Sequence, residues 1–251
     1  MATTRGTKLS KSDSMVLAQV FDPESAPSVT EILIDPYLPA DRNIQDERLL
    51  SDLKAREVEV IRTIEDFEKG SRQDTKHDVY QEALTSITDL IDAHPNYASA
   101  RNNRAQLIRW RYGDRQTICR PRASQSREST DAILAALDDL RHAIELASPP
   151  RPQDAVSAAQ CRLLGQAYTQ LAAIYYAASK DLASSDDMIV ACEQFENWGQ
   201  NAFEEEGAKN FRLGGLYGNE VSKAMSVHTN PYAKLCGAMV KEAMKKEFAQ
   251  A

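Results

Sequence analysis

The sequence predicts an all-α fold: a right-handed solenoid of antiparallel helix pairs that ends in a capping C-terminal helix. Apolar residues recur at helical spacing through most of the 251 residues, as they do on the buried side of amphipathic helices. Glycine and proline separate the periodic stretches, and no stretch alternates apolar and polar residues as a half-buried strand would. Because one helix pair cannot bury its apolar face alone, several pairs must stack around a shared core.

The N-terminal region is expected to lie outside the helix pairs. Residues 1–11 are polar and without periodicity, so they are expected to be disordered. Residues 12–43 should form a short helix, stopped by Asp22-Pro23, and then a proline-rich segment that wraps over the body. The apolar residues Ile32, Leu33, Ile34 and Tyr37 would anchor that segment.

The helical repeat domain should cover residues 44–227, with pairs at about 44–95, 96–150 and 153–206, followed by an extra helix. Its best-defined helix lies between Pro95 and Gly113, where Asn96 is a good N-cap and small residues allow a neighbouring helix to approach. Asn103-Arg104-Ala105 is typical of the first helix of a tetratricopeptide repeat (TPR). The matching second helix would span Ala136–Leu146 and end before Pro149.

The third pair should join a long helix at about 154–178 to a second helix containing Ala191, Phe195 and Trp198. Ser184-Ser185-Asp186 would cap that second helix. The extra helix is expected at about 208–227. Residues 228–251 should form the capping helix, because Pro231 suits a first helical turn and lysines occupy its outer side.

The turn of the second pair carries an unusual insertion, Gly113–Ser126. Six arginines lie from Arg109 to Arg127. A solvated loop is the expected structure, anchored at most by Ile118 and Cys119. Binding of an acidic partner, or phosphorylation of a nearby serine, stays open.

Composition excludes several classes of protein. The net charge of −7 argues against nucleic-acid binding, which needs a basic surface. No apolar run is long enough to span a membrane, and the N-terminus lacks the apolar core of a signal peptide, so the cytosol is expected and the nucleus is possible. The four cysteines lack metal-ligand spacing, so no metal or other cofactor is expected.

Residues in catalytic arrangements are not recognisable in the sequence. The four histidines lie far from any cysteine or serine that could act as a nucleophile, and paired carboxylates such as Asp138-Asp139 point apart on a helix. The protein is therefore predicted not to be an enzyme. The alternative is a helical enzyme or small-ligand-binding protein that uses aromatic residues of the third pair: Tyr168, Tyr175, Tyr176, Phe195 and Trp198.

Three stretches resemble the tetratricopeptide repeat protein 36 family: Val16–Pro23, Ala98–Gln106 and Asn230–Cys236. The resemblance implies a fungal-type relative with insertions, and a non-enzymatic adaptor or scaffold that binds proteins through a TPR groove. It further implies two classes of partner. One is a chaperone component, and the other is a tyrosine-catabolism enzyme, 4-hydroxyphenylpyruvate dioxygenase.

The groove expected from this resemblance would be lined by Lys54, Asn102, Asn103, Gln106, Gln166 and Gln170. In chaperone-binding TPR proteins, lysine, arginine and asparagine side chains of three repeats hold a C-terminal carboxylate together. Lys54 and Asn103 match that set, whereas Val58 replaces an asparagine, and Gln166 and Gln170 replace the cations of the third repeat. An acidic chaperone-type tail should therefore bind weakly. Asn103 could also be a packing residue.

Overall fold

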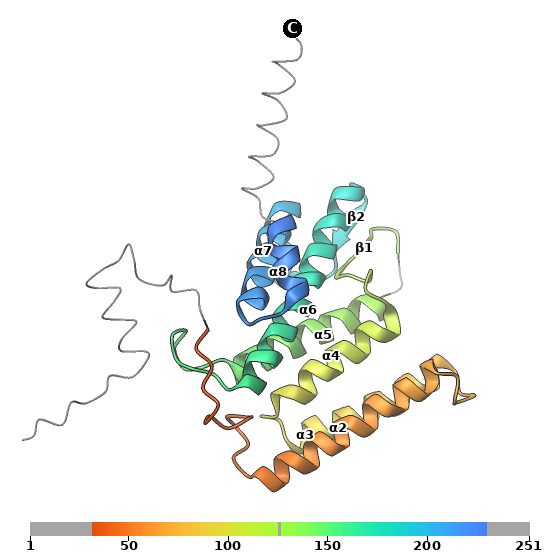
Figure 1. Cartoon of the computed structure of the whole chain (residues 1–251). Helices are drawn as coiled ribbons and strands as arrows, with labels where there is room; N and C mark the ends of the chain where they lie inside the picture. The colour runs from red at the N-terminus through yellow and green to blue at the C-terminus, as the bar shows by residue number, and fades with distance from the viewer. Residues whose placement is uncertain (1–31, 125–126, 230–251) are drawn as a thin grey trace, which may run out of the picture.

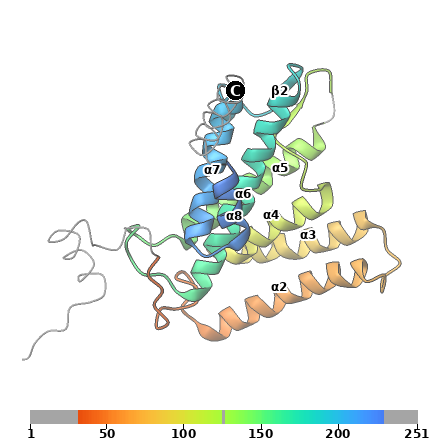
Figure 2. The ribbon, with the colours of Figure 1, turned by 45° about the horizontal axis from the view of Figure 1, so that its top comes forward.

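A computed structural model describes residues 32–124 and 127–229. Within these ranges the chain is mostly helical, with helices α2 to α8 and one short two-stranded ribbon. Successive helices pack against one another in order, as Figures 1 and 2 show, which confirms the all-α solenoid. The expectations for residues 1–31 and for the capping helix from residue 230 onward lie outside the described residues.

The first helix pair consists of α2 (Glu47–Glu68) and α3 (Lys76–Ala93). The Asp46 carboxylate caps α2 by accepting hydrogen bonds from two backbone N–H groups of its first turn. Thr75 and Asp78 form a reciprocal capping box at the start of α3. The two helices lie antiparallel, and each buries one apolar side.

The second pair consists of α4 (Ala98–Tyr112) and α5 (Glu128–Ala147). The N-cap of α4 is Tyr97 rather than Asn96, and its side chain makes no capping hydrogen bond. Gly113 ends α4 at a φ of 94°, a left-handed conformation that strongly favours glycine. The predicted pair therefore exists, with a different residue at its first cap.

The third pair differs from the prediction in its second helix. Its first helix, α6 (Ala158–Ser184), begins with a capping box between Ser157 and Gln160. The partner helix is α7 (Gln200–Leu216), followed by α8 (Glu220–Thr229). The helix predicted around Ala191, Phe195 and Trp198 is wrong, because that stretch forms strand β2 (Met188–Val190) and a single 3₁₀ turn (Glu193–Phe195).

The insertion after α4 is more buried than predicted. Its strand β1 (Cys119–Pro121) pairs antiparallel with β2, placing Cys119 opposite Val190. Ile118 is fully buried and Cys119 nearly so, and the Ala191 N–H donates to the Ile118 carbonyl at 2.9 Å. Ile118 and Cys119 anchor the insertion, as the sequence indicated, and Thr117 is buried beside them, whereas residues 113–116 and 121–123 are exposed. The loop after α4 and the loop after α6, which belong to different helix pairs, thus stabilise each other.

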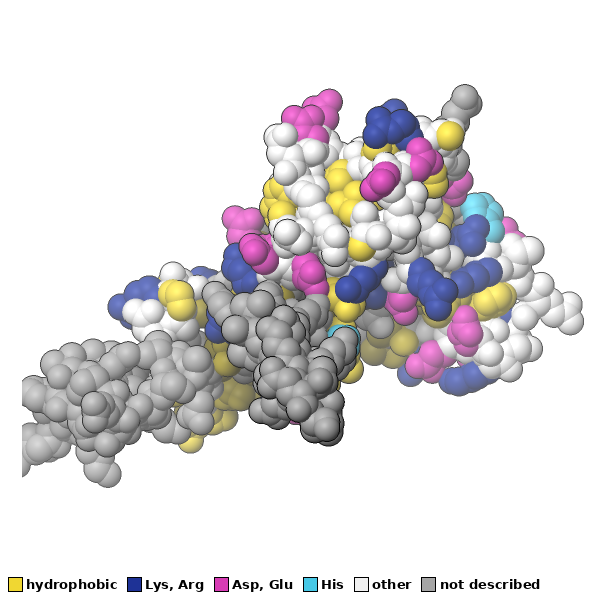
Figure 3. All heavy atoms as spheres, turned by 90° about the horizontal axis from the view of Figure 1, so that it is seen from above, with side chains coloured by type: hydrophobic (Ala, Val, Ile, Leu, Met, Phe, Trp, Pro, Cys, Tyr) yellow, Lys and Arg dark blue, Asp and Glu magenta, His cyan; other side chains and the backbone are white. Residues whose placement is uncertain are grey.

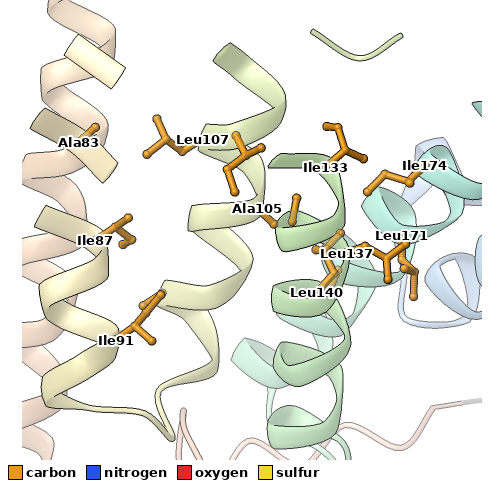
Figure 4. Packing of buried hydrophobic residues seen from close by; sticks show 14 of the residues in the cluster. Ala83, Ile87, Ile91, Ala105, Leu107, Ile133, Leu137, Leu140, Leu171 and Ile174 are labelled. Atoms are coloured by element: carbon orange, nitrogen blue, oxygen red, sulfur yellow. The ribbon is translucent and has the colours of Figure 1, made fainter. Parts of the chain in front are cut away.

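One continuous apolar core joins the three pairs. In Figure 4, residues of α3, α4, α5 and α6 follow one another across the stack, from Ile87 through Ala105 and Leu137 to Leu171. All four are buried, and the small Ala105 lets α4 and α5 approach closely. This contiguity is what a stack of helix pairs requires.

The segment before α2 packs on the connection between α5 and α6. Residues around Ile34 and Val156 form a parallel β-bridge, in which the Asp35 N–H donates to the Val156 carbonyl at 3.0 Å. Arg42 donates to the Ser148 carbonyl, and the Asn43 amide donates to the Leu146 carbonyl at 3.0 Å. This segment therefore links the start of the first pair to the end of the second.

Candidate functional site

Two adjoining hollows form a groove across the first helices of the three pairs. The apolar hollow lies mainly between α2 and α4 and has a volume of about 210 Å³. The polar hollow lies between α4, α6 and the turn after α7, and has a volume of about 450 Å³. Gln106 and Trp110 line both hollows. We refer to the two together as the groove.

The apolar hollow takes its walls from aliphatic side chains of α2 and α4: Val60, Ile61, Ile64 and Leu107. Ile61 is 44% exposed, although most large aliphatic side chains of the fold are buried. Trp110 closes one end, where its indole N–H donates to the Glu68 carboxylate at 2.8 Å and the Lys76 ammonium lies over its ring. This hollow offers an unfilled place for an apolar side chain of a ligand.

The polar hollow contains one buried cation. The guanidinium of Arg109 lies among the side chains of Gln106, Gln166 and Gln170 on this wall. Its Nη2 donates to the Asp114 carboxylate at 2.6 Å, and the Arg109 side chain is 15% exposed whereas that of Asp114 is 82% exposed. Burial lowers the pKa of Arg109, and the Asp114 charge acts in the opposite direction.

Asn103 lies in the apolar hollow beside a buried carboxylate. Its amide donates to Glu57 Oε1 at 2.8 Å, while the Tyr97 hydroxyl donates to Glu57 Oε2 at 2.5 Å. Burial raises the pKa of Glu57, and the hydrogen bonds from Tyr97 and Asn103 oppose that shift. The packing interpretation of Asn103 thus has a specific partner in Glu57, which takes one of the two amide N–H donors.

Asn102 and Gln170 are buried against each other between α4 and α6. The Gln170 amide donates to Asn102 Oδ1 at 3.0 Å. Both side chains are more than nine-tenths buried. They join the second and third pairs, and Asn102 itself does not line the groove.

Lys54 lies apart from the other predicted site residues. It is exposed and lines a separate hollow with Ile44 and Leu50, beside the segment that precedes α2. Of the six predicted groove residues, Asn103, Gln106, Gln166 and Gln170 line the groove described above. Gln106 and Gln166 are the exposed ones, so their amides can reach a ligand.

Arg109 is the groove residue that the sequence comparison missed. The known carboxylate-binding set has its cations at the positions of Lys54, Gln166 and Gln170, and it has none at the position of Arg109. Helical spacing gives the signal instead: Asn103, Gln106 and Trp110 are separated by three and four residues, and Arg109 follows Gln106 by three. One stripe of α4 therefore faces the groove along its length.

The aromatic residues of the third pair do not line the hollows described above. Tyr175, Phe195, Trp198 and Phe203 pack in mutual contact, with ring centroids 4.9 to 6.2 Å apart. Tyr168 instead stacks on Tyr217, and Tyr176 meets Phe211 edge to face. These rings pack mainly against one another and against neighbouring aromatic side chains.

Cys119 and Cys161 are buried free thiols, as expected of packing residues. Burial raises the pKa of Cys119 to about 12, which keeps the thiol protonated and unreactive. Among residues 32–124 and 127–229, histidine, cysteine and carboxylate side chains form no cluster suited to a metal ion. In the same ranges, no helix combines the length and the apolar character needed to cross a membrane.

The face of the molecule seen from above (Figure 3) carries charged side chains of both signs. In the view from above, acidic and basic side chains lie close together, with hydrophobic side chains showing between them (Figure 3). Such interspersed charge is typical of a solvated surface.

No family model matches the chain, and no solved structure matches it. Tetratricopeptide repeat protein 36 of Xenopus tropicalis is 23% identical over 224 residues, covering 87% of this chain and 85% of that protein. The same protein of Danio rerio is 25% identical over 202 residues, covering 80% of each chain. The L-tyrosine degradation gene cluster protein hmgX of Aspergillus fumigatus is 35% identical over 246 residues, covering 95% of this chain and 93% of that protein. Given this similarity over nearly the full length of both proteins, the chain belongs to the family of the L-tyrosine degradation gene cluster protein hmgX.

Proposed function

We propose that this protein is a non-enzymatic adaptor of tyrosine degradation that binds a protein partner in its groove. The observation that carries the proposal is the groove itself, whose two hollows share Gln106 and Trp110 and take their other lining residues mainly from α2, α4 and α6. It combines an apolar hollow with a polar one, and this combination suits an extended peptide segment better than a single small molecule.

The names of the relatives direct the choice of partner. One relative is named for an L-tyrosine degradation gene cluster, and two others are tetratricopeptide repeat proteins. The partner we propose is an enzyme of tyrosine degradation, with 4-hydroxyphenylpyruvate dioxygenase as the first to test, and the compartment is the cytosol. A chaperone component is the second candidate partner.

The test uses a matched pair of substitutions on exposed aliphatic residues. Ile61 lines the groove and is 44% exposed, whereas Val221 lies on α8, is not among the residues that line either hollow, and is 63% exposed. Ile61→Lys should abolish retention of purified 4-hydroxyphenylpyruvate dioxygenase on the immobilised protein, and Val221→Lys should leave it unchanged. Equal retention by both variants would contradict groove binding.

Substitution of the buried amides is a less useful test. Asn103→Ala combined with Gln170→Ala would remove hydrogen bonds to Glu57 and Asn102 inside the fold. A loss of binding in that double variant could come from a shift of α4 or α6 as well as from a lost contact with the ligand. Ile61→Lys avoids this ambiguity, because the side chain projects into open space.

A further inference from the structure

We infer that residues 14–21 of this chain bind in the apolar hollow between α2 and α4, as an internal ligand that a partner must displace. The hollow suits an apolar occupant, because its lining is mainly aliphatic and Ile61 is 44% exposed there. The chain supplies an apolar segment shortly before the described residues begin. Displacement by a partner rests on the proposed function, whereas binding of the segment in the hollow does not.

The segment has the pattern of a short helix that binds through one side. Residues 14–21 read SMVLAQVF and stand directly before the proline break at Asp22-Pro23. At helical spacing, one side of the segment carries the apolar residues Val16, Leu17, Val20 and Phe21, and the opposite side carries Gln19. Apolar anchors three and four residues apart are typical of a helix that docks in an apolar groove. So short a helix is unstable alone in water, so its apolar side needs a surface to cover it.

The lining of the hollow matches such anchors. Ile61 and Ile64 of α2 face Leu107 of α4 across it, and the buried Ile87 of α3 also lines it. Val58 precedes Ile61 by three residues on α2 and is 42% exposed, so it extends the apolar surface beyond the hollow. A volume of about 210 Å³ receives side chains from one side of a helix and excludes the helix itself.

The described chain begins where this segment can reach the hollow. Its first residues lie on the side where α2 and α4 begin (Figure 1), and the bridge between Ile34 and Val156 holds them near the start of α6. Residues 22–31 can extend to about 35 Å, whereas Ile61 lies about 21 Å along α2 from its first residue. Residues 230–251 instead follow α8, at the opposite end of the stack (Figure 1). The N-terminal segment is therefore the better-placed occupant.

Charge favours the same arrangement. Residues 1–11 carry three basic side chains, Arg5, Lys8 and Lys11, and no acidic one. With residues 14–21 in the hollow and the linker coming from the start of α2, these residues would continue toward the end of α2. The last turn of α2 contains Glu65, Asp66 and Glu68 and no basic residue. Lys69 pairs with Glu65 at 2.8 Å, so the negative charge of this turn still exceeds the positive charge beside it. Complementary charge of this kind fixes the direction in which a segment binds.

The covalent connection makes weak contacts sufficient. A tethered ligand meets its site at a high effective concentration, so a few apolar side chains can keep the hollow occupied. A partner that needs the same surface at Ile61 then binds only the fraction of molecules in which the hollow is open. Its apparent affinity is reduced by that fraction. The N-terminal segment would thus regulate access to the apolar hollow.

The experiment places a photo-crosslinking residue, p-benzoylphenylalanine, at Phe21 of the full-length protein. Illumination of a mixture of isotopically heavy and light chains, followed by mass spectrometry, identifies each crosslinked residue and whether both ends belong to one chain. The inference predicts crosslinks within one chain to residues 57–64 of α2 or 103–110 of α4. Crosslinks confined to other elements, crosslinks that join heavy to light chains, or the absence of crosslinks would overturn it.

A matched pair of substitutions assigns the crosslinks to the apolar side of the segment. Leu17→Asp should lower their yield on the order of tenfold, because transfer of a leucine side chain from water changes an equilibrium constant by at least that factor. Gln19→Asp introduces the same charge on the opposite side and should leave the yield unchanged. Ile61→Lys should lower the yield from the side of the hollow. Equal yields in Leu17→Asp and Gln19→Asp would contradict docking through this side.

Retention of purified 4-hydroxyphenylpyruvate dioxygenase tests the displacement separately. Leu17→Asp should increase retention on the order of two- to tenfold, because more molecules have an open hollow, and Gln19→Asp should not. If Leu17→Asp leaves retention unchanged while Ile61→Lys abolishes it, the displacement is wrong although the proposed function holds. If no variant retains the dioxygenase, the proposed function fails for this partner, and the crosslinks still decide whether the segment occupies the hollow.

Discussion

The first two helix pairs and the third differ in what they bury. In α2 to α5, buried polar groups link the helices: Glu57 accepts from Tyr97 and Asn103, and Asp139 accepts from Arg104 at 2.6 and 2.8 Å. In α6 to α8, aromatic rings form a contiguous cluster, and the buried polar side chains are uncharged, such as Ser222, which shares a hydrogen bond of 2.6 Å with Thr169. The two regions also differ in their hollows, because the apolar hollow takes all its lining residues from α2, α3 and α4.

Directional polar contacts hold α2 and α4 at a spacing that leaves part of the surface between them open. In the third unit, Tyr175, Phe195 and Phe203 are buried and in mutual contact. The first two pairs supply most of the residues that line the groove, and the third unit supplies the opposite wall of the polar hollow. The following changes test each side of the comparison.

The largest effect is expected in the aromatic cluster of the third unit. Phe203 is fully buried and contacts Tyr175, Phe195 and Trp198. Phe203→Ala should lower the free energy of unfolding by about 3–5 kcal/mol, because it leaves a cavity that rigid neighbours cannot fill. Urea denaturation would measure the change. Phe203→Leu, which keeps most of the volume, should cost clearly less, and equal losses would argue against tight packing here.

Loss of the buried ion pair should have the next largest effect, in the second pair. The Asp139 side chain is 4% exposed, and Arg104 is its bidentate partner from α4. Arg104→Ala should destabilise the fold by about 3 kcal/mol, because Asp139 stays buried with only the longer contact to Arg101. Chemical denaturation should also show the double variant Arg104→Ala/Asp139→Ala to be more stable than the single one. A double variant that is less stable would mean that the lone carboxylate is not the cause.

A smaller effect is expected at the close approach of α7 to α8 and α6. A methyl group at Gly214 would lie 2.5 Å from Ser222 Oγ and 3.0 Å from Thr169 Oγ1. Gly214→Ala should therefore cost about 1–3 kcal/mol in stability, the usual range for overpacking. Gly199 is the control, because a methyl group there meets no atom within 4 Å and its backbone is unstrained. Thermal unfolding of both variants should show a clear loss only for Gly214→Ala.

The pH dependence of stability should give the smallest effect. Burial raises the pKa of Glu57 above its ordinary value of 4.5. The folded state therefore binds the proton more tightly than the unfolded state, so this contribution to stability is present below pH 4.5 and is lost as pH rises through the folded pKa. Denaturation midpoints measured between about pH 4 and pH 8 should fall less with rising pH in Glu57→Gln. Burial also raises the pKa of Asp41. Asp41 should therefore still contribute to the pH dependence of stability in the Glu57→Gln variant.

The sequence alone determined the helix pairs and much of the groove surface. Local signals specify α2 to α6, because capping residues, glycine turns and helical periodicity act within a few residues of one another. The resemblance to TPR proteins, and not these local signals, predicted Gln106 and Gln166 as groove residues, and both line the hollows. The local signals failed for residues 186–199, where Phe195 and Trp198 resemble helix positions but are buried through contacts with Tyr175 and Phe203.

Tertiary structure decided the rest, because the deciding contacts join residues distant in sequence. Strands β1 and β2 pair although α5 and α6 lie between them in the sequence, and no local pattern encodes that pairing. Asn103 is held by Glu57 from α2, and Gln170 by Asn102 from α4. Arg109 becomes the cation of the polar hollow only because stacking brings α4 beside α6. The charge of a site built between helices is therefore set by which helix faces meet, and a comparison of positions along one repeat does not contain that information.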